Sequence, residues 1–256
     1  MKKSNKSLVT ERTLNVLMLF ATEKELSVSQ IASLLDENIS SVYRIVNTME
    51  AQDFIEQKSN KKYTLKTPNI LKLYNMVSKE IREYAKPVLI SIVERFKESV
   101  YLSELYEQEN IMIIEKQDSP NRLKWTENIG HVYHIPTGTG GKTHLAYIVR
   151  NMDEKQKTEY LSKLKLTKYT AKSITDVSEL RKSIDQIVAD GYCITEGEHV
   201  EEIVGIAVPV FNSINDECRH VLSMVMTASR FDPSKKDAYI HALQEGAKRI
   251  GQNLSN

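Results

Sequence analysis

Residues 27–65 constrain the fold of this chain more than any other stretch, because they combine two helix starts with a basic hairpin. Gln30 follows Ser27 by three residues, the spacing of a capping box, in which the two side chains satisfy backbone donors at a helix N-terminus. Asp36-Glu37-Asn38 interrupts the helix that follows, and Asn38 is a good N-cap for a second helix. The pattern predicts two short helices joined by a tight turn.

The two predicted helices bury apolar stripes and leave a polar face on the second. The first helix is expected to bury Ile31, Ala32, Leu34 and Leu35. The second has an apolar stripe at helical spacing, formed by Val42, Ile45, Val46 and Met49. Its opposite face carries groups that meet phosphates and base edges in DNA: Ser40, Ser41, Tyr43, Arg44, Asn47 and Thr48. We expect this face and the cap residue Ser27 to contact DNA.

A hairpin with a basic tip follows the second helix. Residues 54–58 and 61–65 flank Ser59-Asn60, a pair that tolerates unusual backbone angles. Lys58, Lys61 and Lys62 cluster at this tip and are expected to reach the phosphate backbone. Each element alone could be an ordinary solvated surface. Their order along the chain favours a winged helix-turn-helix, in which the second helix enters the major groove.

Composition limits the class of protein without identifying it. The chain has 256 residues, 41% hydrophobic and 27% charged, which is typical of a globular protein with room for two domains. The net charge is only +1, and residues 1–66 hold ten Lys and Arg against eight Asp and Glu. Affinity for DNA must therefore come from a local patch. Cys193 and Cys218 match no metal or redox motif, so a reduced, cytoplasmic setting is expected.

The N-terminus resembles a signal peptide only superficially. Lys2 and Lys3 precede an apolar run at 14–21, but that run is short and contains Asn15. We expect a helix entered at Thr10 instead. No apolar run approaches the length of a membrane span.

The rest of the chain predicts a linker helix and then an alternation of strands and helices. Pro68 precedes an amphipathic segment, and Pro87 is expected to open a helix that runs through Phe96. Strands are expected at 100–106, 111–116, 203–211 and 218–227, and helices near 139–150, 153–164, 177–190 and 233–252. The predicted domains are a DNA-binding domain at 1–66, a linker helix at 67–86, and an effector-binding and oligomerisation domain at 87–256.

Gly138-Thr139-Gly140-Gly141-Lys142-Thr143 invites interpretation as a phosphate-binding loop, which would make the chain an enzyme. The full motif needs a glycine where this sequence has Pro136, which has no N–H to donate to a phosphate. The glycines still allow a compact turn into a helix N-terminus, so Thr139 and Gly140 are candidates for a ligand pocket. No catalytic constellation is recognisable, and no cofactor is expected.

Two segments combine histidine with glutamate, the residue types of metal and acid–base sites. His131 and His134 lie near Glu127, but no further ligand follows at zinc spacing, so no metal is expected. The glutamates around His199, at 196, 198, 201 and 202, are expected to form a solvated loop.

Several segments together resemble the IclR family of bacterial transcriptional regulators. Ser40-Ser41-Val42-Tyr43-Arg44 is similar to the core of that family's recognition helix. Gly141-Lys142-Thr143-His144-Leu145-Ala146 is similar to its Gly-Lys helix start. Gly191-Tyr192, Glu198 and residues 206–212 resemble its C-terminal signature, and the match spans about residues 8–250.

The resemblance implies an α+β chain: an N-terminal winged helix-turn-helix, a linker helix and a C-terminal GAF-like α/β ligand-binding domain. It also implies dimers or pairs of dimers on palindromic DNA operators, controlled by a small molecule, often an organic or aromatic acid. The pocket positions of the family fall here on Thr139, Gly140, Thr195, Gly205, Ser223 and Val225. Gly205 and Val225 are expected to leave more space and less polarity in the pocket than the usual family residues, which favours a ligand with an apolar or aromatic body.

We therefore expect a cytoplasmic, homo-oligomeric DNA-binding regulator, a repressor, with a small-molecule sensor. One winged helix contacts few base pairs, and a two-fold dimer doubles the contacts at fixed spacing. Apolar residues of the first helix and the linker are expected to serve the dimer interface: Leu14, Leu17, Leu71 and Leu73. Two alternatives remain, a phosphate- or nucleotide-binding enzyme using residues 138–143, and a DNA-binding protein whose C-terminal domain only oligomerises.

Overall fold

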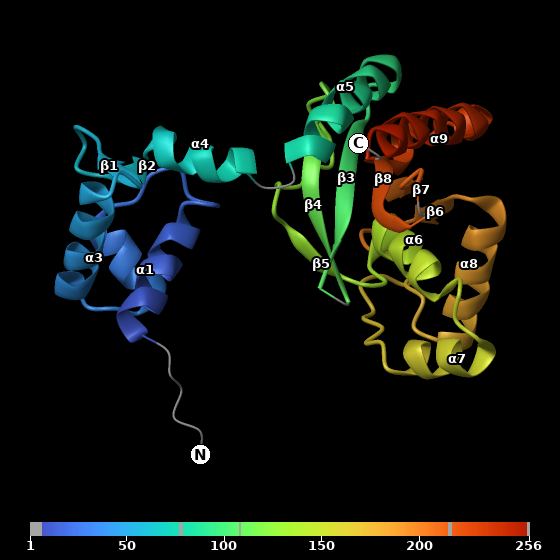
Figure 1. Cartoon of the computed structure of the whole chain (residues 1–256), viewed down its shortest axis with the longest axis horizontal. Coiled ribbons are helices and arrows are strands. Elements are labelled where there is room, and N and C mark those ends of the chain that lie inside the picture. The colour runs from blue at the N-terminus through green and yellow to red at the C-terminus, as the bar shows by residue number, and fades with distance from the viewer. Residues whose placement is uncertain (1–6, 77–78, 108, 215–216, 255–256) are drawn as a thin grey trace. The chain divides into compact units, whose positions relative to one another are not determined.

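The computed structural model describes residues 7–76, 79–107, 109–214 and 217–254, and the chain divides into two compact units at 1–77 and 78–256 (Figure 1). The N-terminal unit contains, in order, α1 (Leu8–Leu19), α2 (Val28–Leu35), α3 (Ile39–Ala51), β1 (Ile55–Gln57), β2 (Tyr63–Leu65) and α4 (Thr67–Met76). β1 and β2 pair antiparallel as a hairpin. This is a winged helix-turn-helix, as the sequence predicts.

Local hydrogen bonds at the starts of α2 and α3 confirm both predicted caps. The Ser27 hydroxyl accepts a hydrogen bond from the backbone N–H of Gln30, and the Gln30 side-chain oxygen accepts one from the backbone N–H of Ser27 at 2.9 Å. The Asn38 side chain accepts from the Ser41 N–H at 2.8 Å. These bonds fix where each helix begins, because the first N–H groups of a helix have no partner within it.

The core of this unit joins all three helices to the hairpin. Ile31 and Ala32 of α2 are buried, and so is the whole stripe predicted for α3. The prediction for Leu34 was wrong, since this side chain is 56% exposed. Successive residues of a helix are rotated by about 100°. Leu34 therefore lies on the far side of Ile31 from Ala32 and Leu35, and falls outside the packed face.

The tip of the wing differs by one residue from the predicted two-residue turn. The Lys58 N–H donates to the Lys62 carbonyl at 2.7 Å, and the Lys61 N–H donates to the Lys58 carbonyl at 3.0 Å. Lys61 adopts φ of 61°, in the left-handed region. The loop is thus Ser59-Asn60-Lys61, a turn followed by one left-handed residue, which is a common way to close a three-residue hairpin.

The C-terminal unit is built on a six-stranded antiparallel sheet with helices on both faces. Its helices are α5 (Lys79–Phe96), α6 (Gly138–Val149), α7 (Glu154–Ser162), α8 (Val177–Asp190) and α9 (Lys236–Asn253). Its strands are β3 (Ser99–Tyr106), β4 (Asn110–Gln117), β5 (Val132–His134), β6 (Cys193–Glu196), β7 (Ile203–Phe211) and β8 (Cys218–Thr227). The strand order is β5-β4-β3-β8-β7-β6, and 3-10 turns η1 (Ala228–Arg230) and η2 (Pro233–Lys235) lead into α9.

The strong strands match the sequence analysis, whereas β5 and β6 were not predicted. Both are short, and a three- or four-residue strand leaves little period-two signal.

The segment predicted as one linker, 67–86, contains α4 and the first part of α5. The prediction that Pro87 opens a helix was wrong, because α5 begins at Lys79 and carries Pro87 inside. Ile81, Ala85, Val88, Leu89 and Ile92 form one buried stripe on both sides of this proline, and their burial holds the helix together despite the missing N–H.

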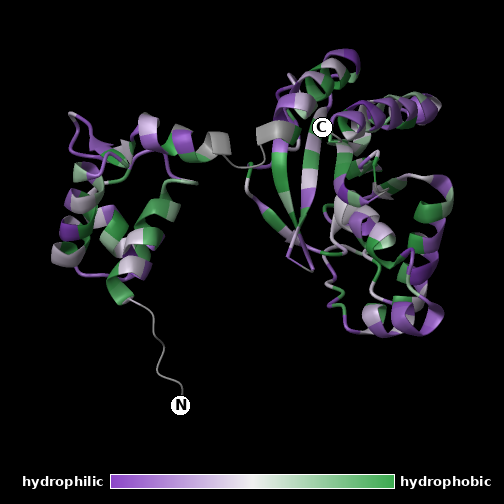
Figure 2. Cartoon of the chain, in the orientation of Figure 1, coloured by the Kyte–Doolittle hydropathy of each residue, from purple (hydrophilic) through white to green (hydrophobic). Residues whose placement is uncertain are grey.

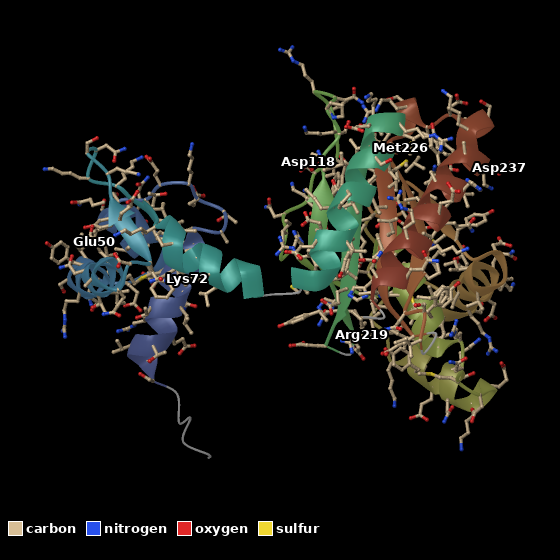
Figure 3. All side chains as sticks on the ribbon, turned by 45° about the horizontal axis from the view of Figure 1, so that its top comes forward. Glu50, Lys72, Asp118, Arg219, Met226 and Asp237 are labelled. Atoms are coloured by element: carbon tan, nitrogen blue, oxygen red, sulfur yellow. The ribbon has the colours of Figure 1, made fainter. Side chains whose placement is uncertain are left out.

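The two faces of the sheet bury different residues of the same strands. Leu222, Met224 and Met226 of β8 face α5 and α9 in the main core. Met226 on β8 is buried, whereas Asp237 on α9 is exposed, and Figure 3 labels both side chains. The outer surface of α9 is largely hydrophilic in Figure 2. The other face of the sheet meets α6, and a second core joins α6, α7 and α8. No helix among the described residues is long and apolar enough to cross a membrane.

Candidate functional sites

The predicted DNA-contacting residues lie on the solvent side of α3 and on the wing. Ser40, Tyr43, Arg44, Asn47 and Thr48 are exposed, and Ser41 is half-buried. Tyr43 keeps 54% of its surface exposed although it is a large ring, so α3 holds it outward without packing it. The Thr48 hydroxyl donates to the Arg44 carbonyl at 2.9 Å, a local bond that leaves the guanidinium of Arg44 unaffected.

The wing presents its lysines at the loop closed by Lys58 and Lys62. Lys58 and Lys61 are exposed and Lys62 is half-buried. Lys58 pairs with Glu56 at 2.5 Å, which leaves Lys61 and Lys62 as the wing-tip cations with no ion pair in the described part of the chain. Ser27 is half-buried at the start of α2, where its hydroxyl already serves as the cap.

A cavity of about 100 Å³ lies in the C-terminal unit between the sheet and the start of α6. Side chains alternate across a strand, so residues two apart share a face. On β8 this brings Ser223 and Val225 to the cavity, and register pairs Gly205 of β7 with both Val225 and Thr195. The structure brings together all six residues assigned to the pocket by resemblance, since Thr139 and Gly140 of α6 also line it.

The side chain of Thr139 occupies the space beside Gly205. A Cβ atom on Gly205 would collide with the Thr139 hydroxyl and lie 3.1 Å from its methyl group. The space above Gly205 is therefore filled by α6, and the expectation that this glycine leaves room for a ligand was wrong. A Cβ on Gly140 would meet Ile111, Ser103 and Ser223 at 3.5–4.0 Å, ordinary van der Waals distances, so a small side chain fits at this position of the cavity lining.

A buried ion pair closes one end of the cavity. Lys142 of α6 is 3% exposed, and its ammonium lies 2.6 Å from a carboxylate oxygen of Glu198. The Ser183 hydroxyl lies 3.4 Å from the same ammonium. The prediction of a solvated loop was wrong for Glu198, because the Lys142 charge and the fold of residues 197–203 draw this side chain inward. The enzyme alternative would require this ammonium to bind a phosphate, but Glu198 already engages it.

Aromatic residues that the sequence analysis did not assign to the site form the rim. Trp125 and Tyr133 line the cavity with His199, and each meets the His199 ring edge-on, at centroid distances of 6.5 and 5.9 Å. Burial lowers the pKa of His199, and it raises the pKa of Tyr133 together with a hydrogen bond to Glu127. Tyr133 belongs to the short strand β5 and Trp125 to the loop before it, and nothing in their local pattern points to the cavity.

A polar cluster supports the floor beneath α6. Ser103 of β3 lies two residues after Tyr101 and faces the cavity, and its hydroxyl is 3.0 Å from Nε2 of His144. Burial lowers the pKa of His144 to about 3, and burial lowers that of His220 on β8 to about 4. Both rings are therefore neutral at pH 7. Period-two alternation on β3 could have identified Tyr101 and Ser103 from sequence.

The described residues contain no group of three or more His, Cys, Asp or Glu able to hold a metal ion. His131 lies 3.4 Å from Glu127 and stacks on Tyr133 at 4.4 Å. His134 belongs to the edge strand β5, where it is exposed. Neither Cys193 nor Cys218 forms a disulfide bond.

Comparison with known protein families matches both units. Residues 9–59 match the IclR helix-turn-helix domain, and residues 74–252 match the description "Bacterial transcriptional regulator IclR C-terminal". The chain belongs to the IclR family. It is a DNA-binding transcriptional regulator with a C-terminal effector-binding domain, and it is not an enzyme.

Curated members of the IclR family cover almost the whole chain. The chain is 24% identical over 249 residues to the HTH-type transcriptional regulator KdgR of Dickeya chrysanthemi, spanning 95% of this chain and 78% of that protein. It is 25% identical over 256 residues to the HTH-type transcriptional regulator KipR of Bacillus subtilis, spanning 99% of each.

Solved structures of the IclR family share the fold. The IclR of Thermotoga maritima superposes with a TM-score of 0.82 at 24% identity, covering 96% of this chain and 98% of that one. An IclR homolog from Microbacterium hydrocarbonoxydans, complexed with 4-hydroxybenzoate, superposes with a TM-score of 0.79 at 20% identity, covering 96% and 98%. The predicted fold class, α+β with an N-terminal winged helix and a C-terminal α/β domain, is confirmed.

Proposed function

We propose that this protein is a cytoplasmic repressor that binds a palindromic operator as a homodimer or a pair of dimers and responds to a ligand in the cavity beside Gly140. Residues 1–66 would bind the DNA, residues 67–86 would link the two domains along the chain, and residues 87–256 would bind the effector and oligomerise. The observation that carries the proposal is that α6, β6, β7 and β8 all contribute residues to the lining of one cavity. This cavity would give the C-terminal domain of a DNA-binding protein a small-molecule site.

Direct DNA contact is supported by the chemistry of one surface. Arg44 and Tyr43 stand exposed on α3, and Arg44 makes no ion pair among the described residues. An arginine in the major groove pairs with guanine O6 and N7. Lys61 and Lys62 offer their charges at the wing tip, where a phosphate gives affinity without sequence preference.

Self-association is supported by apolar side chains that the N-terminal unit leaves exposed. On α1, Leu14 and Met18 lie one turn apart and are 56% and 66% exposed, and Leu73 of α4 is 53% exposed. Leu17 packs against the core of its own unit, and the side chain of Leu71 lies outside the described residues. Leu14 and Met18 share one face of α1, and exposed apolar residues on one face favour an interface.

In vitro selection from a random double-stranded DNA pool tests operator binding by the full chain. Two half-sites related by two-fold symmetry are expected, and sedimentation should give at least a dimer at micromolar concentration. Leu14→Glu should shift sedimentation toward the monomer, while Glu11→Gln, an exposed neighbour on α1, should not. A selected site without symmetry, or a monomer that binds it with full affinity, would contradict the proposal.

A metabolite screen by thermal shift tests the sensor role. Compounds that stabilise the protein should also change its affinity for the selected operator, because a ligand shifts DNA binding only by binding the two states unequally. Gly140→Leu should fill the cavity toward Ile111 and Ser223 and abolish this response while operator binding by the free protein persists. Loss of the response with retained DNA binding supports the site, and a full response in this variant places the sensor elsewhere.

A further inference from the structure

The charges of the cavity are unusual for a site expected to take an acid. Among its described lining residues, the fixed charges are the carboxylates of Glu127 and Glu198, and no lysine or arginine is present. The nearest buried cation, Lys142, already binds Glu198 at 2.6 Å. This ion pair compensates the charge of Glu198, so Glu127 is the carboxylate of the described lining that has no lysine or arginine partner.

The carboxylate of Glu127 is largely buried where it lines the cavity. Its side chain is only 10% exposed, with His131 at 3.4 Å on the exposed side, and the Tyr133 hydroxyl donates a hydrogen bond to it. A carboxylate removed from water retains its charge at low cost only when a cation or several donors meet it. The two oxygens of a carboxylate have about four acceptor positions, so Glu127 can still accept a hydrogen bond from a ligand on its cavity side.

The neighbours of Glu127 are aromatic. Trp125 and Tyr133 line the cavity beside it, and the His199 ring stands nearly perpendicular to both, at 82° and 88°. Burial lowers the pKa of His199, so its ring is neutral at pH 7, and its Nδ1 is buried without a hydrogen-bond partner. Aromatic side chains beside a carboxylate favour positive charge.

Building on the sensor role proposed above, we propose that the effector of this protein is an organic cation, an amine with an aromatic or aliphatic body. Its ammonium lies against Glu127 and the rings of Trp125 and Tyr133, and its body extends toward Gly140 and Val225. An acid in the same place would face the Glu127 carboxylate, with no lysine or arginine in the described lining to receive it. The cationic class thus differs from the organic acids that the family resemblance implies.

Trp125 provides the readout, because it is the only tryptophan of the chain and it lines the cavity. Fluorescence titrations of the full-length protein would use three probes with one benzyl group: benzylamine, benzyl alcohol and phenylacetate. Benzylamine should bind at least about tenfold more tightly than benzyl alcohol, since a hydrogen bond to a charged group is stronger than a neutral one. Phenylacetate should give no saturable change.

Glu127→Gln should abolish the preference for the amine while leaving affinity for the alcohol. Its amide oxygen still accepts a hydrogen bond, so the fold should persist. Glu201→Gln is the matched control, because this exposed glutamate follows His199 by two residues and lies outside the cavity lining. Trp125→Leu, followed by thermal shift, should also weaken the amine, and the fold should tolerate it because Ser99 and Tyr101 bind only the backbone carbonyl of this residue.

The outcomes separate the ligand class from the sensor role. Selective amine binding that depends on Glu127 supports the proposal. Saturable binding of phenylacetate in preference to benzylamine overturns the cationic class and keeps the sensor site. An amine preference that survives Glu127→Gln, or no binding of any of the three probes, overturns the proposal as well. The sensor role is tested separately, by whether Gly140→Leu abolishes the response of operator binding to the stabilising metabolites.

Discussion

The side chain of Thr139 lies directly over Gly205, so that α6 packs against the bare backbone of β7. Any Cβ at position 205 would meet the Thr139 hydroxyl closer than real contacts allow. The glycine is needed here for close approach of a helix to a sheet, although its φ is ordinary. This contact fixes the mouth of the cavity, because Thr139 and Gly205 both line it.

Gly205→Ala should therefore lower the free energy of unfolding by about 1–3 kcal/mol, the usual cost of overpacking. Thr139→Ala removes the two nearest atoms and leaves the Thr139 Cβ at 3.3 Å, so the double variant should recover most of that loss. Urea unfolding of the four proteins in this cycle measures the coupling. Additive losses in the double variant would show that the two residues do not meet.

Arg44→Ala should weaken binding to the selected operator by about 1–3 kcal/mol and relax specificity at one base pair. Alanine is a strong helix former, so α3 should remain intact. Mobility-shift titrations give the affinity, and circular dichroism checks the fold. An unchanged operator affinity with an intact fold would contradict the assignment of α3 as the recognition helix.

Lys61→Asn should weaken binding to specific and random DNA alike and reduce the salt dependence by about one phosphate contact. Asparagine suits this test because it tolerates the left-handed φ of 61° that the wing requires, so the charge is lost without new strain. Lys72→Gln removes the same charge from the exposed surface of α4 and is expected to change neither quantity. A slope that is equal in wild type and Lys61→Asn would remove the wing tip from the interface.

Lys142→Met should lower the free energy of unfolding by about 3 kcal/mol, because it leaves the Glu198 carboxylate without its partner in a largely buried position. Adding Glu198→Gln should restore part of the loss, since a neutral amide is easier to bury than a lone charge. Thermal and urea unfolding compare the single and double variants. If the double variant is less stable than Lys142→Met, the ion pair is not the reason for the loss.

Acid should destabilise the C-terminal unit through its buried histidines. The pKa values of His144 and His220 fall from the ordinary 6.5 to about 3 and about 4, so the unfolded chain binds protons that the folded protein does not. Stability is therefore complete above pH 6.5 and falls as the pH drops toward 4, by about 1.4 kcal/mol per pH unit for each ring.

Urea unfolding between pH 7 and pH 4 measures this dependence. His144→Gln keeps a hydrogen-bonding group beside Ser103 and removes the titrating ring, so its pH slope should be shallower than that of the wild type. Equal slopes in the two proteins would assign the acid sensitivity to other groups.

The sequence by itself determined the parts of this protein that depend on neighbours along the chain. The caps at Ser27 and Asn38, the apolar stripe of α3, and the strands β7 and β8 follow from residue types at short spacing, which local hydrogen bonds and periodic burial enforce. Thr139 and Gly140 of α6 were pocket candidates from the glycine-rich turn alone, whereas the pocket positions on β6, β7 and β8 followed only from the family resemblance.

Only the tertiary structure decided which of these residues meet. Strand register places Thr195, Gly205 and Val225 side by side, and the approach of α6 fills the space above Gly205 with Thr139. The loop carrying Trp125 and Glu127 reaches His199, more than seventy positions further along the chain. Burial then sets the charges, neutral at His144 and paired at Lys142. Such contacts depend on distances through space and on exclusion of water, and neither is written in the spacing of residues along the chain.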